Sequence, residues 1–265
     1  MRVATLASGS AVRSPTGSRF PAARSSFILL PFAAFSANIR HMKIYLATGN
    51  LNKKREISQV LPDFEVVIPK EMGIDFDPEE TGTDFYQNSM IKALDLWHKA
   101  RSLEKTPPLV MADDSGICVD ALDGAPGVWS ARYAGPDFMK GKPDGSKISQ
   151  DEQNRFLIEQ TTAALASGTP QNGFLYQNGP RSCHYSCSMV LLINPSRFFI
   201  AQETMEGTVI DRIEDARGSG GFGYDPIIYL PQFQKTVAEL SADQKNAISH
   251  RGKATRAILQ VIKSL

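Results

Sequence analysis

Residues 43–53 read KIYLATGNLNK, and this stretch decides the fold class that the sequence predicts. Residues 44–47 form a short apolar run, which is typical of a buried strand. The polar residues 48–50 then favour a turn. Residues 52–61 carry apolar side chains at helical spacing until Pro62 ends the pattern. A buried strand, a tight turn and a helix in this order predict an α/β protein.

The turn between this strand and helix is a candidate phosphate-binding loop. The first N–H groups of a helix lack intrahelical partners, and they lie at the positive end of the helix dipole. Gly49 lets the backbone approach a ligand closely, and Lys53 supplies a compact positive charge. The stretch lacks the longer glycine loop ending in Lys-Ser/Thr that defines a Walker motif. A capped helix start without a ligand is the alternative interpretation.

The rest of the chain first alternates strands and helices and then becomes rich in strands, which favours a mixed sheet over a purely parallel one. Helix 84–99 has one apolar stripe, and Asn88 and Lys92 lie one turn apart on its polar face. Residues 136–150 are rich in Gly, Pro and Lys and predict a surface insertion. The other predicted strands are 64–68, 109–112, 182–193, 198–206 and 227–230, and the other helices are 151–166 and 251–263.

Two acidic segments suggest a magnesium site. Residues 113–116 read DDSG, follow a predicted strand and are expected to form a turn, and Glu80 lies in a second acidic segment. Magnesium is usually held by one or two carboxylates together with substrate phosphates. We therefore expect Asp114 to bind a metal or to act as a base. Asp113 is expected only to shape the turn, as Asx residues often do.

Two later segments carry candidate substrate contacts. Residues 218–223 match the glycine pattern of dinucleotide-binding proteins, but Pro226 leads into a strand instead of a long helix, so that interpretation fails. A flexible loop that presents Phe222 to a nucleobase fits better. Further on, Lys245 and residues 249–252 (SHRG) supply donors for a purine carbonyl or a phosphate. A packed Phe and a solvated basic helix end are the alternatives.

Composition limits the other classes of function. A net charge of +1 gives no electrostatic footprint for a nucleic-acid or membrane partner. Three cysteines are too few for a disulfide framework and predict a reducing compartment. Residues 1–41 contain five arginines and seven serines but no Asp or Glu, which is typical of a transit peptide. A secretory signal fits this composition less well. Translation from Met42 is the third interpretation, and the folded domain is expected over residues 42–265.

The order of these motifs closely resembles that of the inosine triphosphate pyrophosphatase family, which removes dITP, ITP and XTP. Seven blocks occur in register over residues 43–265: TGNLNK, EETG, NSMIKA, ADDSG, GAPGVWSARYAG, GGFGYDP and SHRG. The resemblance implies an elongated mixed β-sheet with flanking helices, forming two lobes around an active-site cleft. It also implies Mg²⁺-dependent cleavage to a nucleoside monophosphate and pyrophosphate, a homodimer and a cytoplasmic location. A mitochondrial or plastid location applies instead if residues 1–41 are a transit peptide.

The resemblance also assigns site residues. Asp114 would activate the attacking water and, together with Glu80, bind the metal. The substrate contacts would be Thr48, Gly49, Asn50, Leu51, Asn52, Lys53, Lys92, Ser115, Phe222, Gly223, Tyr224, Asp225, Lys245, His250 and Arg251. The last three would donate to the 6-oxo group of hypoxanthine or xanthine and leave the amino group of adenine poorly paired. Gln87 departs from the family, which usually has Glu there. A non-catalytic nucleotide-binding protein and a pyrimidine-selective pyrophosphatase are the alternatives.

Overall fold

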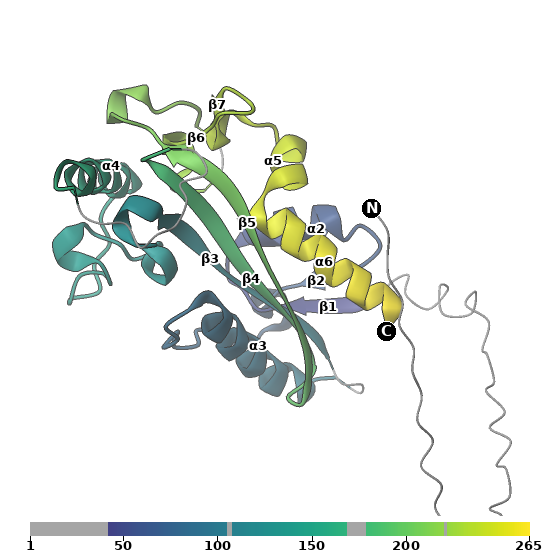
Figure 1. Cartoon of the computed structure of the whole chain (residues 1–265). Coiled ribbons are helices and arrows are strands. Elements are labelled where there is room, and N and C mark those ends of the chain that lie inside the picture. Colours follow the sequence, from purple (N-terminus) through teal and green to yellow (C-terminus); the bar gives the residue numbers. More distant parts are fainter. Residues whose placement is uncertain (1–41, 105–107, 169–178, 220–221) are drawn as a thin grey trace, which may run out of the picture.

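The computed structural model describes residues 42–104, 108–168, 179–219 and 222–265, which form a seven-stranded mixed sheet with helices on both faces (Figure 1). The strands are β1 Lys43–Leu46, β2 Glu65–Val67, β3 Leu109–Val119, β4 Ser182–Asn194, β5 Arg197–Val209, β6 Ile228–Leu230 and β7 Lys235–Thr236. The helices are α2 Leu51–Val60, α3 Phe85–Arg101, α4 Gln150–Ala166, α5 Ala242–Ile248 and α6 His250–Ser264. No helix in the described ranges is long and apolar enough to cross a membrane.

The strand order β2-β1-β3-β4-β5-β6-β7 leaves part of β3 without a neighbour on one side. β1 pairs in parallel with β2 and β3, and all later pairs are antiparallel. The last residue of β1, Leu46, lies opposite Met111. β3 continues beyond that point beside β4, and its other edge next meets described residues near its end, where Ile117 bonds to Ser130 and Cys118 bridges to Pro126. This free edge gives loops access to the middle of the sheet.

The half of the sheet that contains β1 is covered on both faces and forms the first lobe. On one face, α2 and α6 pack through Ile57 and Ile258 against Met111 of β3. On the other face, α3 packs through Leu96 against Val110. Because side chains alternate along a strand, odd-numbered positions in this part of β3 face α2 and α6, and even-numbered positions face α3.

The distal parts of β3, β4 and β5 form a second lobe with α4, β6 and β7. Ile117 of β3, Leu157 of α4 and Ile228 of β6 belong to one apolar cluster, which shares no buried residue with the two clusters of the first lobe. The acidic residues of β3 lie between these cores. The predicted fold, an elongated mixed sheet carrying two lobes, is therefore confirmed (Figure 1).

One local prediction is wrong. Residues 113–116 do not turn but continue β3, where Asp113 pairs with Met189 and Gly116 with Ser186 of β4. Asp and Gly are uncommon in strands, and here the long pairing with β4 outweighs that local preference. The polar face of α3 that carries Lys92 is not solvated, since Lys92 is only 6% exposed. The remaining predicted helices and strands are confirmed, with small differences at their ends.

Candidate active site

A cavity of about 700 Å³ lies along the free edge of β3 and is lined by residues of both lobes. Pockets for small organic ligands are commonly about 300–1,000 Å³. Leu51 and Asn52 were expected to contact substrate, but both side chains are exposed and do not line the cavity. The other predicted site residues all line it: Thr48, Gly49, Asn50, Lys53, Glu80, Lys92, Asp114, Ser115, Phe222, Gly223, Tyr224, Asp225, Lys245, His250 and Arg251.

The predicted phosphate loop is capped by its own side chain. Asn50 Oδ1 accepts hydrogen bonds from the N–H groups of Asn52 at 2.9 Å and Lys53 at 3.3 Å. Two helix N–H groups that were expected to face phosphate are therefore occupied. Among the described residues, the N–H groups of Gly49 and Leu51 have no partner, so they remain donors for a ligand. Leu51 can thus contribute through its backbone although its side chain is exposed.

Asp114 faces α3, as its even position on β3 requires. Lys92 Nζ lies 2.8 Å from Asp114 Oδ1 and 3.5 Å from the Glu80 carboxylate. The Asn88 amide donates to Asp114 at 3.3 Å, and its carbonyl accepts the Gly82 N–H at 2.8 Å. Asn88 thereby fixes the acidic segment against α3. Burial alone would lower the pKa of Lys92, but the neighbouring carboxylates, Asp114 foremost, raise it, so Lys92 stays charged.

Asp113 faces the opposite side of the sheet and is 1% exposed. Its Oδ2 lies 3.1 Å from Lys53 Nζ and 3.1 Å from Arg251 Nε. Burial would raise the pKa of this carboxyl, but the Lys53 and Arg251 charges outweigh burial and hold the pKa well below its usual range. The expectation that Asp113 only shapes a turn is wrong. It anchors a lysine of the phosphate loop and an arginine of α6 at one point.

Arg251 and Lys245 share a second carboxylate, that of Glu56 on α2. Glu56 lies 2.6 Å from Arg251 and 3.5 Å from Lys245. Both cations also lie 4.7 Å from the ring centroid of Phe222, within cation–π range. Glu56 was not predicted as a site residue. A signal was present, because Glu56 follows Lys53 by three residues and residues at that spacing share a helix face.

Asp225 organises the loop that carries Phe222. Its carboxylate accepts hydrogen bonds from the Lys245 ammonium at 2.6 Å, the Phe222 N–H at 2.6 Å and the Tyr185 hydroxyl at 2.9 Å. Burial raises the pKa of Asp225 above its usual value despite the Lys245 charge. Tyr185, which lies on β4, was not predicted as a site residue. Its periodic apolar strand gave no sign that its hydroxyl would reach the cavity.

His250 begins α6 and is only 5% exposed. Its ring stacks on that of Tyr185, with the two centroids 5.0 Å apart. Burial, together with the Arg251 and Lys245 charges, holds the pKa of His250 well below 6.5, so the ring is neutral near pH 7. Its Nδ1 has no hydrogen-bond partner among the described residues. Of the three donors expected to read a purine, His250 therefore contributes a neutral ring with one N–H.

The second lobe supplies the opposite wall of the cavity. A loop of this lobe lies directly on β3 at Gly116, where an added Cβ would collide with the Gly127 carbonyl and the Ser130 hydroxyl. The hydroxyl of Tyr224 donates to the Ser130 carbonyl at 2.9 Å. The 136–150 insertion is largely exposed, as predicted, yet Lys147 at its end lines the cavity. The interpretation of this insertion as surface alone was therefore incomplete.

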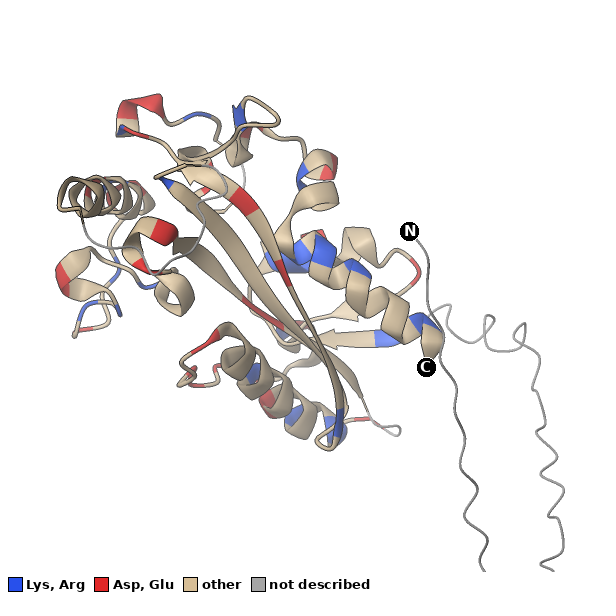
Figure 2. Ribbon diagram, viewed as in Figure 1, with Lys and Arg blue, Asp and Glu red and all other residues tan. Residues whose placement is uncertain are grey.

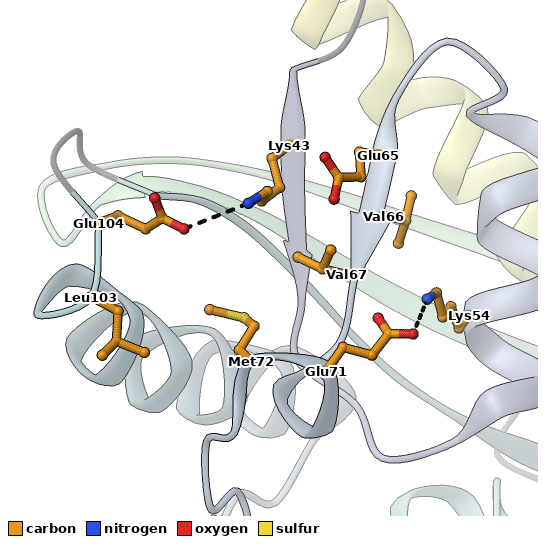
Figure 3. A pocket seen from close by; sticks show the side chains of 9 residues that line it. All are labelled: Lys43, Lys54, Glu65, Val66, Val67, Glu71, Met72, Leu103 and Glu104. Atoms are coloured by element: carbon orange, nitrogen blue, oxygen red, sulfur yellow. Dashed lines mark hydrogen bonds and ion pairs between the residues drawn. The ribbon is translucent and has the colours of Figure 1, made fainter.

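A second cavity, of about 510 Å³, lies beside β1 and the edge strand β2 (Figure 3). Both of its lysines are paired: Lys54 with Glu71, and Lys43 with Glu104 at 3.8 Å. None of the predicted site residues lines it. We therefore place the candidate active site in the cavity along β3.

Comparison with known proteins identifies the family of the chain. The model of the Ham1 family matches residues 44–261. A dITP/XTP pyrophosphatase of Treponema denticola is 47% identical over 222 residues, which cover 84% of this chain and 99% of that protein. A dITP/XTP pyrophosphatase of Clostridium perfringens is 34% identical over 225 residues, which cover 84% of this chain and 98% of that protein.

Solved structures show the same fold. A HAM1 protein from Coxiella burnetii gives a TM-score of 0.66 at 33% identity, covering 84% of this chain and 100% of that chain. A nucleoside-triphosphatase / dITP/XTP pyrophosphatase from Mycobacterium abscessus gives a TM-score of 0.55 at 30% identity, covering 82% of this chain and 99% of that chain. These matches confirm the resemblance found in the motifs. The chain belongs to the Ham1 family.

Proposed function

We propose that this chain hydrolyses non-standard purine nucleoside triphosphates (ITP, dITP, XTP and dXTP) to the nucleoside monophosphate and pyrophosphate. The observation that carries the proposal is the position of Asp114. This carboxylate lines the cavity beside Lys92 and Glu80, with the capped loop before α2 lining the same cavity. The names of the relatives, dITP/XTP pyrophosphatases, support this reaction and lend nothing to a non-catalytic or a pyrimidine-selective protein.

Each residue would have a defined part in the reaction. Asp114 would take a proton from water while the water oxygen forms a bond to the α-phosphorus. The bond between that phosphorus and its bridging oxygen breaks, and pyrophosphate leaves with the bonding electrons. Lys53 and Lys92 would hold the phosphate oxygens, because phosphoryl transfer depends mainly on positioning and charge neutralisation.

The residues present fit a magnesium ion. Asp114 and Glu80 both contact the Lys92 ammonium, so their oxygens converge on one place. Among the described residues, no group of three or more His, Cys, Asp or Glu side chains is arranged to hold a metal. Two carboxylates completed by substrate phosphates is the usual arrangement for Mg²⁺, which neutralises the charge on the phosphates when bound.

The base would lie near the Phe222 loop. Arg251 and Lys245 present charged donors beside this ring, and His250 presents a neutral one. Donors of this kind pair with the 6-oxo group of hypoxanthine or xanthine and leave the amino group of adenine unpaired, which costs binding energy in a buried site. The homodimer and the cytoplasmic location expected from the resemblance stay predictions.

Pyrophosphate release from ITP, XTP, dITP, GTP and dTTP in the presence of Mg²⁺ tests the proposal. We expect turnover of ITP, dITP and XTP and much slower turnover of GTP and dTTP. Equal turnover of GTP and ITP would contradict the selectivity, and a preference for dTTP would favour a pyrimidine enzyme. No turnover of any of them would contradict the catalytic function.

A further inference from the structure

The two walls of the cavity differ in how their positive charges are neutralised. In the wall built on the sheet, every cation has a protein carboxylate close by. The pairs are Lys53 with Asp113 at 3.1 Å, Lys92 with Asp114 at 2.8 Å, Lys245 with Asp225 at 2.6 Å and Arg251 with Glu56 at 2.6 Å. An anion that approaches such a pair is attracted by one charge and repelled by the other, so the net attraction is smaller than that of an unpaired cation.

The wall from the second lobe contains two cations of another kind, Arg132 and Lys147. Neither side chain has an ion pair or a hydrogen bond with any described residue. Lys140 of the same insertion differs from them, because its ammonium lies 5.4 Å from the centroid of the Trp129 ring. Figure 2 shows Lys and Arg positions on the loops of this lobe next to α4.

Contacts fix the backbone near both residues, whose side chains are exposed. Gly141 has a φ of +101°, which favours glycine, and an added Cβ would lie 3.2 Å from the Cβ of Arg132. The insertion therefore rests directly on the segment that carries Arg132. Shortly after Lys147, Ser149 caps α4 through a capping box, and the Gln150 side chain packs against Gly223. The insertion is thus held at Gly141 and at its C-terminal end, next to the cavity-lining residue Lys147.

We propose that Arg132 and Lys147 bind the polyphosphate of the substrate from the second lobe, opposite the loop before α2. This inference rests on the proposed function, since it concerns the same site. The one carboxylate of the cavity lining without a partner in the described chain, Asp77, belongs to the segment that carries Glu80 and the proposed Mg²⁺ site. Arg132 and Lys147 are therefore the positive charges that substrate phosphates meet without competition from a protein carboxylate.

Charge reversal with a matched control tests the proposal. Arg132→Glu and Lys147→Glu change charges that line the cavity, and Lys142→Glu makes the same change in the same insertion at a residue that does not line it. The readouts are the KM for ITP, the inhibition constant of pyrophosphate, and the affinity for inorganic tripolyphosphate by calorimetry. We expect Arg132→Glu and Lys147→Glu each to raise the KM for ITP and the inhibition constant of pyrophosphate by about tenfold, and to lower the affinity for tripolyphosphate by about the same factor. Each variant both removes an attraction and adds a repulsion.

Lys142→Glu is expected to stay within about twofold of the wild type, because charges that solvent separates from a ligand are screened. If Arg132→Glu and Lys147→Glu match this control in all three readouts, the inference is wrong. The tripolyphosphate measurement needs no catalysis, so it separates this result from a failure of the proposed function. A wild-type chain that binds tripolyphosphate more tightly than both variants but releases no pyrophosphate would contradict the enzyme and keep the inference.

Discussion

On one face of β3, Asp113 is closed off from solvent by Lys53 and Arg251, whereas on the other face Asp114 lines the cavity beside Lys92. The two carboxylates are neighbours in sequence. Their different surroundings follow from the alternation of side chains along a strand, which turns one toward α2 and α6 and the other toward α3. The comparison shows that a pair of adjacent acidic residues can combine two roles. One holds the parts of the site together, and the other is available for chemistry.

The largest expected effect on stability comes from removing the charge of the buried carboxylate, Asp113. Asp113→Asn should lower the free energy of unfolding by about 3–5 kcal/mol, because it removes the charge that neutralises the buried Arg251 and the partly buried Lys53. Urea unfolding followed by circular dichroism measures the change. A loss below about 1 kcal/mol would be the behaviour of an exposed ion pair and would contradict the anchoring role.

The pH dependence of Asp113 has a definite sign. Its pKa in the folded chain lies below the usual value of 3.8, so its contribution to stability is complete above that pH and is lost as the pH falls further. Acid unfolding of the wild type and Asp113→Asn should therefore converge at low pH. Acid unfolding can be measured on the same wild-type and Asp113→Asn samples as the urea unfolding.

A smaller effect on stability is expected at His250, in the part of the cavity that would hold the nucleobase. The folded state holds the pKa of His250 below 6.5. As the pH falls, the imidazole of His250 is therefore protonated in the unfolded chain before it is protonated in the folded chain. The free energy of unfolding should decrease below pH 6.5 by up to about 1.4 kcal/mol per pH unit. His250→Gln should remove that part of the slope, as measured by urea unfolding at several pH values. An unchanged slope in the variant would show that His250 does not titrate in this way.

Sequence reasoning located most of the fold because the evidence for it is local. Apolar spacing defines α2, α3 and α6, and residues 109–112 carry the apolar start of β3. The continuation of β3 through DDSG depends on its pairing with β4, far along the chain. No local pattern reports that pairing, and the composition of DDSG favours a turn.

The site was predicted best where a short motif carries the chemistry. Lys53 and Arg251 were both found, but the partners that hold them were missed, because Asp113 and Glu56 act through contacts between distant segments. Lys92 was expected on the polar face of α3, but its burial was not predicted, since a buried lysine is uncommon unless it is paired. Lys147 could not be found, because its position depends on how the insertion crosses the cavity.

The central claim, that Asp114 rather than its neighbour serves the reaction, is tested most directly by pyrophosphate release from ITP by Asp114→Asn. Lys92 keeps Glu80 as a partner in this variant, so the protein should still fold. We predict a rate at least about a hundredfold below that of the wild type, together with an intact circular dichroism spectrum. A rate close to that of the wild type would contradict the assignment of Asp114 as the base.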